Sequence, residues 1–153
     1  MRKKCKRKIW STAINPIAHA IAGAAITDRD SLNKLRTKEY AALDEFVHGR
    51  GTLDHWKTLT DLLNLSEMMA KQGIGVEVLD VCKKAQMALI KAGERYEKTR
   101  KFGFDGPGIQ AIRDLIEYAD LQQSSISRSE FERMIEKTRN YMASNIDKIH
   151  IMT

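Results

Sequence analysis

The sequence predicts an all-α fold: a compact bundle of about five to six helices, mostly antiparallel neighbours, with a disordered basic N-terminal tail. Two observations carry this prediction. Apolar residues recur at steps of three and four through most of the chain, and no segment alternates with the period of two that is typical of strands. The two prolines, Pro16 and Pro107, both stand at apparent helix starts, which favours long helices.

The chain of 153 residues suits a single helical domain, residues 14–153, behind a flexible tail, residues 1–13. Hydrophobic residues make up 42% and charged residues 30%, an ordinary composition for a soluble protein. The cysteines, Cys5 and Cys82, form no paired motif, so we expect a reducing, cytoplasmic setting in a host cell.

The most apolar run near the start, residues 14–26, is too short and too interrupted to span a membrane. No membrane contact is therefore expected. A signal-peptide core followed by cleavage is the alternative interpretation of this run.

The net charge of +6 lies entirely in the first eight residues. The cations there are Arg2, Lys3, Lys4, Lys6, Arg7 and Lys8. Because the chain has 26 Lys and Arg against 20 Asp and Glu, the rest of it is formally neutral. A block of like charge is expected to be disordered when unbound. These six residues are candidates for contact with a polyanion, such as nucleic-acid phosphates or an acidic partner, and a purely solubilising tail is the alternative.

The first three helices are expected over residues 16–25, 31–48 and 52–72. Asn15 followed by Pro16 is a good helix start, and the short helix after it is apolar on nearly every side, as in segments that are buried or dock on something. Gly49 and Gly51 end the second helix, and Thr52 is placed to cap the third.

A fourth helix, residues 76–100, is expected to pack on the third, because Gly73 and Gly75 allow a turn between them. It carries one narrow apolar stripe of Val78, Cys82, Ala85, Leu89, Ala92 and Tyr96. Such a stripe is the seam that two packed helices share, so these two helices are expected to be the hub of the fold. If the stripe were exposed, it would favour a homodimer.

The last two helices are expected over residues 109–123 and 128–149, and Ser127 with Glu130 matches a capping box before the second of them. The loop ahead of them, residues 101–108, contains Phe102 and Phe104. A tight turn that packs both rings in the core is the expected arrangement. If the rings are exposed instead, they are candidates for a protein contact.

Asp114, Glu117 and Asp120 follow one another at steps of three on the expected helix 109–123. Carboxylates arranged in this way could support acid–base chemistry or hold a divalent cation. A solvated helix face has the same spacing, and no second acid-rich helix is evident. The cluster is therefore a weak candidate, and no catalytic residue is assigned.

No metal or cofactor is expected. The histidines are His19, His48, His55 and His150, and none follows another at three or four residues. His48 and His55 flank a glycine-rich turn and could meet in space, but structural roles are favoured for both.

Four segments, residues 15–19, 32–37, 59–65 and 106–111, resemble stretches of small uncharacterised proteins encoded by phages, prophages and plasmids of proteobacteria. The similarity covers most of the chain after the tail. The family supplies no catalytic residue to carry over. Its genomic setting implies a protein that binds and blocks a host machine, including CRISPR effectors and other defence complexes.

The leading hypothesis is a non-enzymatic, phage-type accessory protein that binds and inhibits or regulates a host protein or nucleoprotein complex, through a helical face and the tail. A nucleic-acid-associated regulator that contacts phosphates through the tail is the alternative. A third hypothesis is an enzyme that uses Asp114, Glu117 and Asp120, and it requires the three carboxylates to converge in one pocket.

Overall fold

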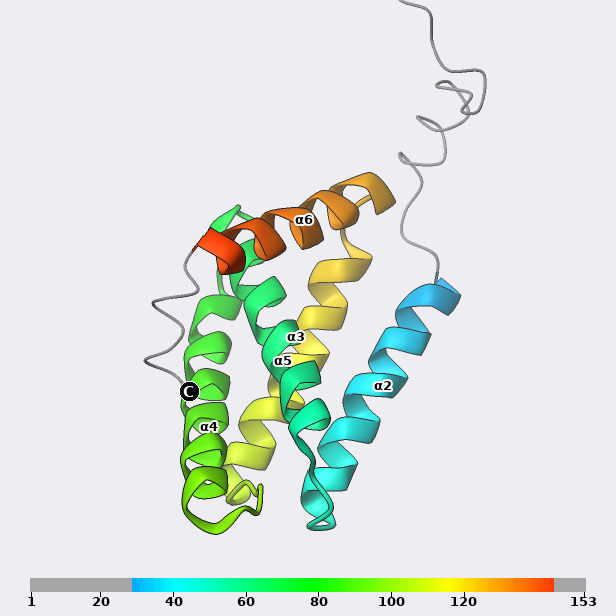
Figure 1. Ribbon diagram of the computed structural model, residues 1–153. Helices are drawn as coiled ribbons and strands as arrows, with labels where there is room; N and C mark the ends of the chain where they lie inside the picture. The colour runs from blue at the N-terminus through cyan, green and yellow to red at the C-terminus, as the bar shows by residue number, and fades with distance from the viewer. Residues whose placement is uncertain (1–28, 145–153) are drawn as a thin grey trace, which may run out of the picture.

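The computed structural model describes residues 29–144, which form five helices and no strand (Figure 1). The helices are α2 Arg29–Val47, α3 Leu53–Lys71, α4 Val78–Thr99, α5 Gly106–Ser124 and α6 Arg128–Ser144. The all-α helical character is confirmed. The basic tail, the expected helix 16–25, Cys5, His19 and His150 lie outside the described residues.

Capping side chains determine where α3 and α5 begin. Thr52 accepts a hydrogen bond from the His55 N–H at 3.4 Å, while His55 Nδ1 accepts the Thr52 N–H at 3.2 Å, so a reciprocal capping box opens α3. Asp105 accepts the Gly108 N–H at 2.7 Å, with Pro107 in the first turn. This cap explains why α5 begins at Gly106, three residues before the predicted start.

The most connected helix is α3, which packs on α2, α4, α5 and α6. The second is α5, which packs on α2, α3 and α4, whereas α4 packs extensively on only α3 and α5 among the helices of residues 29–144. The predicted hub of α3 and α4 is therefore half right. The reason is the width of the buried faces: α4 buries one narrow stripe, while α5 buries a broader set that can reach three neighbours.

The broad buried face of α5 consists of Gly108, Ala111, Ile112, Leu115, Ile116, Ala119, Gln122 and Gln123. The first four of the five helices form the bundle, and α6 lies across one end of it (Figure 1). The mostly antiparallel arrangement of neighbours stays a prediction.

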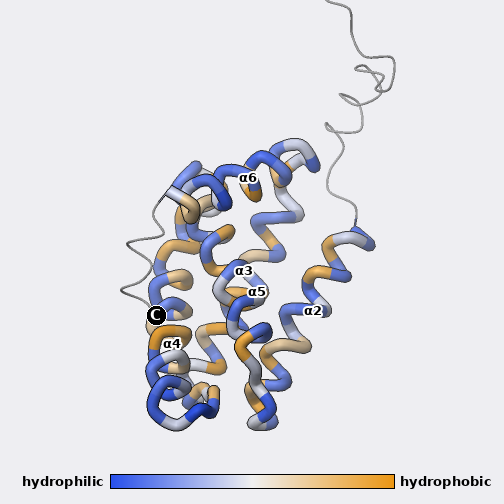
Figure 2. The backbone as a smooth tube through the Cα atoms, viewed as in Figure 1, coloured by the Kyte–Doolittle hydropathy of each residue, from blue (hydrophilic) through white to orange (hydrophobic). Residues whose placement is uncertain are grey.

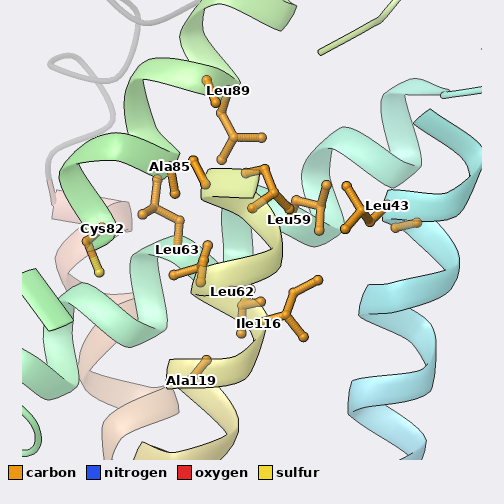
Figure 3. Close-up of a cluster of buried hydrophobic side chains, with 14 of the residues drawn as sticks. Leu43, Leu59, Leu62, Leu63, Cys82, Ala85, Leu89, Ile116 and Ala119 are labelled. Atoms are coloured by element: carbon orange, nitrogen blue, oxygen red, sulfur yellow. The ribbon is translucent and has the colours of Figure 1, made fainter. Parts of the chain in front are cut away.

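The core fills the space on both sides of α3. Leu59 and Leu63 of α3 lie between Leu43 of α2 and the side chains of Cys82 and Ala85 of α4 (Figure 3). All five are at most 3% exposed. The predicted stripe of α4 is thus confirmed as a packing seam, and its small side chains let the helices approach closely.

The helix α6 is the most weakly buried of the five. Its buried residues are Phe131 and Met134, which join Met69 and Ile126 in a separate small cluster over the end of α3. Figure 2 shows that most of α6 is hydrophilic along its length. We infer that α6 is a lid on one end of the bundle rather than a member of its main core.

One buried amide ties three segments together. Gln122 Nε2 of α5 donates to the carbonyl oxygen of Ile74 at 2.8 Å and to that of Ser66 at 3.2 Å. Gly75 has a φ of +69°, and a Cβ added there would lie 3.2 Å from Gln122 Cγ. The turn between α3 and α4 therefore packs directly against α5. Glycine is favoured at position 75 because the backbone has a positive φ and because a Cβ would crowd Gln122.

Replacing Gln122 tests this tie. We expect Gln122→Ala to lower the free energy of unfolding by about 2 kcal/mol, because the Ile74 carbonyl loses its partner and a cavity opens. Urea unfolding followed by circular dichroism measures the change.

The matched control is Ser66→Ala, since the Ser66 hydroxyl is buried and has no hydrogen-bond partner within the described part of the chain. We expect Ser66→Ala to change stability by less than about 1 kcal/mol. Equal losses in the two variants would contradict the role given to Gln122.

Candidate functional site

A row of cations lies on one side of α4. Lys84, Lys91, Arg95 and Lys98 follow one another at steps of seven, four and three, so they share a helix face, and all four are exposed. That face lies beside the buried stripe, so packing on α3 and α5 fixes its orientation. The spacing of these four cations can be read from the sequence. The net charge of the chain does not reveal it, because acids elsewhere balance them.

These cations border two adjoining hollows along the seam between α4 and the start of α5. Their volumes are about 430 and 360 Å³. Both are bordered by Ala88, Lys91 and Asp105. Lys84 and Met87 line the first hollow only, and Arg95 and Lys98 line the second only.

Two glycines give the seam its shape. A Cβ added to Gly108 would lie 3.5 Å from the Ala88 Cβ and 2.8 Å from Asp105 Oδ1, so α5 starts close against α4. A Cβ added to Gly103 would lie 2.9 Å from Arg95 Nη1. Glycine at position 103 therefore leaves room for the Arg95 guanidinium beside the loop.

Exposed apolar side chains lie on the same face as the cations. Met87 on the first hollow is 60% exposed. Tyr118 and Leu121 are 41% and 63% exposed, and they follow Asp114, which also lines that hollow, by four and seven residues. That spacing places both on the α4 side of α5. We call this surface of Lys84, Met87, Lys91, Arg95, Lys98, Tyr118 and Leu121 the α4–α5 face.

The charges that border the two hollows are mixed: Asp105, Asp114 and the exposed Glu94 lie beside the cations, and the first two have hydrogen-bond partners. Asp105 accepts the Gly108 N–H as a helix cap, and Asp114 accepts from Gln110 Nε2 at 2.8 Å. None of the ion pairs in the described residues involves the four cations of α4. Residues at the N-terminus of α5 border both hollows, and the Asp105 carboxylate caps that terminus. The arrangement suits an acidic ligand.

The loop before α5 buries the ring of Phe102, so the exposure on which its candidacy for a protein contact depended is not observed. Phe102 is 7% exposed, and its ring stacks on Tyr96 with centroids 4.2 Å apart and meets Phe46 edge-on at 5.7 Å. Phe104 is half-buried, with its centroid 4.6 Å from that of Phe46. The loop therefore packs both rings against Phe46. This packed arrangement is the alternative that the sequence favoured.

The structure does not gather the three carboxylates of α5. Asp114 lies on the seam with α4, Glu117 is exposed, and Asp120 lies 3.1 Å from Arg36 Nη1 of α2. Two steps of three residues rotate a helix position by about 120°, which explains the divergence. Among the described residues, no group of three or more His, Cys, Asp or Glu could hold a metal ion.

Asp120 instead faces a carboxyl that the sequence did not single out. Burial, and to a lesser degree the charge of Asp120, raise the pKa of Glu39 to about 7, although Arg36 and Lys38 oppose the shift. Burial also raises the pKa of Asp61 on α3. No local pattern could have revealed this, because the carboxyls belong to different helices.

The two described histidines have local structural roles. His48 Nδ1 lies 2.9 Å from the Asp44 carbonyl oxygen at the end of α2, and His55 completes the capping box of α3. Each imidazole is therefore explained by its own helix end. The expectation of structural roles for them is consistent with these contacts.

Comparison with known proteins identifies no relative: no protein-family model, no curated protein and no solved structure matches the chain. The resemblance to proteins of phages and plasmids therefore stays a prediction. None of the helices in residues 29–144 is long and apolar enough to cross a membrane.

Replacing Phe102 tests whether its ring stabilises the core. We expect Phe102→Ala to lower the free energy of unfolding by about 3–4 kcal/mol, because a buried ring with three aromatic neighbours is lost. Phe104→Ala is the milder control, since that ring is half-buried. Thermal and urea unfolding measure both, and an unchanged stability of Phe102→Ala would contradict the core role.

The raised pKa of Glu39 predicts that stability falls as pH rises. The carboxyl titrates near 4.5 when unperturbed and near 7 in the folded protein, so between these values the folded state binds more protons than the unfolded state. The contribution of protonated Glu39 is fully present below the lower value and is lost as pH rises through the upper one.

We expect Glu39→Gln to reduce this loss by about 1–2 kcal/mol between about pH 5 and about pH 8, a figure reduced for partial solvent exposure. Urea unfolding of both proteins at the two pH values measures it. An identical pH dependence in the variant would contradict the assignment to Glu39.

Proposed function

We propose that this chain is a non-enzymatic binding protein that holds an acidic partner on the α4–α5 face. The observation that carries the proposal is the combination of four exposed cations and three exposed apolar side chains on one rigid surface. Protein interfaces combine apolar anchors such as Tyr and Met with Arg and a polar rim in this way. The divergence of Asp114 and Asp120 also leaves the enzyme hypothesis without its converging carboxylates.

The proposed biological role is that of a phage-type accessory factor in the host cytoplasm. It would bind a host protein or nucleoprotein complex stoichiometrically and inhibit or regulate it, with a defence complex such as a CRISPR effector among the candidates. The resemblance noted in the sequence supports this role. The six cations of residues 2–8 would add a second contact with the same acidic partner.

The second candidate function is binding of nucleic acid. Lys84 to Lys98 spans 14 residues of one helix, which is about 21 Å and long enough to meet several successive phosphates. Together with the tail, this row would give a contact that is insensitive to base sequence. The exposed Met87, Tyr118 and Leu121 favour a protein partner over this alternative, since phosphates make no use of aliphatic surface.

Charge reversal on the α4–α5 face tests the proposal. The tagged full chain is used to capture partners from a proteobacterial lysate, and captured proteins are quantified by mass spectrometry. We expect Lys91→Glu with Arg95→Glu to reduce the specific partner at least about tenfold. The matched control is Lys83→Glu with Lys101→Glu, which makes the same change in net charge at exposed positions outside both hollows.

Fluorescence anisotropy with a duplex DNA and an RNA, at low and moderate salt, separates the two functions. Binding that falls steeply with salt and is lost in the Lys91 and Arg95 variant would favour the second candidate. Equal capture by the face variant and its control, with no nucleic-acid binding, would exclude the α4–α5 face from either role.

A further inference from the structure

A second groove lies on the other side of the bundle, at the end covered by α6. It is formed by the N-terminal half of α2, by α3 and by α6, and its volume is about 180 Å³. The apolar residues that line it are Leu35, Leu62, Leu65, Phe131 and Ile135. The polar ones are Lys38, Glu39, Thr58, Asp61 and Gln123. None of these residues belongs to the α4–α5 face.

No other segment of residues 29–144 covers the N-terminal half of α2 along this groove. Leu35 follows the buried Leu32 by three residues and precedes the buried Ala42 by seven, which is the position of a core residue, yet it is 40% exposed. The helix packs on α3 and α5, and α6 packs on α3, but α2 and α6 have no extensive contact with each other. The groove is the notch that this arrangement leaves above α3.

The groove suits an uncharged occupant. Burial raises the pKa of both Glu39 and Asp61, so the carboxyls that line it are already partly removed from water. A charged segment entering there would lose its own hydration as well. An apolar segment without acids would instead cover Leu35 and Phe131 and add no further charge to a groove that already holds Lys38, Glu39 and Asp61.

The chain itself carries such a segment directly before α2. Residues 9–27 contain no Asp, Glu, Lys or Arg, and Ile17, Ile21 and Ala25 recur within them at steps of four. A helix over residues 16–25 would be about 15 Å long, and the three residues 26–28 can span about 10 Å. Leu35 lies about 9 Å along α2 from its first residue, within reach of a segment that turns back.

We propose that residues 16–25 bind as a short helix in the groove between α2, α3 and α6, where they cover Leu35, Phe131 and Ile135. The tether of three residues gives the segment a high effective concentration at the groove, which favours it over a second copy of the chain. The proposal does not depend on the function of the α4–α5 face.

Disulfide trapping tests the contact in the full chain. In a Cys5→Ser background, which leaves only the buried Cys82, Leu35→Cys is paired in turn with Ile17→Cys, Ile21→Cys and Ala25→Cys. We expect at least one pair to form an intramolecular disulfide, because a docked helix brings one Cα within about 7 Å of position 35. Mass spectrometry of the monomer under mild oxidation measures the yield.

The matched control replaces Leu35→Cys by Val47→Cys, an equally exposed position on the same helix about 18 Å farther along. We expect its yield to be at least about tenfold lower. Equal yields at positions 35 and 47 would overturn the proposal. A disulfide between two copies only would overturn it in favour of a second chain as the occupant.

Hydrogen exchange provides a measurement that needs no cross-link. We expect amides of residues 17–25 to be protected at least about tenfold in the wild-type chain and to lose that protection in Leu35→Asp, while Val47→Asp has no effect. Unprotected amides in the wild-type chain would overturn the proposal, even if the disulfide forms. Protection that survives Leu35→Asp would place the segment elsewhere.

Discussion

The direct contact between α3 and α5 is the constraint on which the rest of the structure depends. These two helices face each other across the bundle, so α2 and α4 are separated and each packs in the furrow that the pair provides. The Gln122 amide reinforces the contact, since its Nε2 donates to the buried carbonyl of Ser66 and to the partly buried carbonyl of Ile74. A shift of α5 along α3 would break these bonds and the fit at Gly75 together.

The same constraint determines which surfaces are available for binding. Among the described helices, α4 packs extensively on α3 and α5, and the side of it that these two helices leave open carries Lys84, Lys91, Arg95 and Lys98. Side chains on a helix that is fixed by a packed stripe hold their spacing, so a partner would meet a surface that is already organised. The notch beside α2 has the opposite character, since nothing else in residues 29–144 covers its apolar side chains, which lie beside Lys38, Glu39 and Asp61.

Features encoded in short stretches could be predicted from the sequence. The stripe from Val78 to Tyr96 and the cap at Thr52 each depend on residues within a turn or two, and the structure confirms both. The prediction that α3 and α4 form the hub was right for α3 and wrong for α4, because the number of helices that a helix contacts depends on tertiary packing. Phe102 was left between two alternatives because its partner Phe46 belongs to another helix.

The candidate site shows the same limit in another form. The cations of α4 can be read from the sequence, but acids elsewhere in the chain balance their charge. They become a candidate binding site only because the fold places them on one face beside two hollows. Asp114 and Asp120 looked like members of one cluster because spacing by three suggests one face. The helix rotates by about 120° between them, and each therefore meets a different neighbour.

The position of Trp56 gives the bundle an optical property. Its indole Nε1 donates to the Leu89 carbonyl oxygen at 3.0 Å, its ring lies against Gly93, and it stacks near Phe102. The fluorophore thus bridges α3, α4 and the loop before α5 in an environment that is partly shielded from solvent. In a Trp10→Phe variant, which leaves Trp56 as the single tryptophan, its emission wavelength and quenching by iodide or acrylamide would report separation of these three segments, without any attached dye, during binding or unfolding.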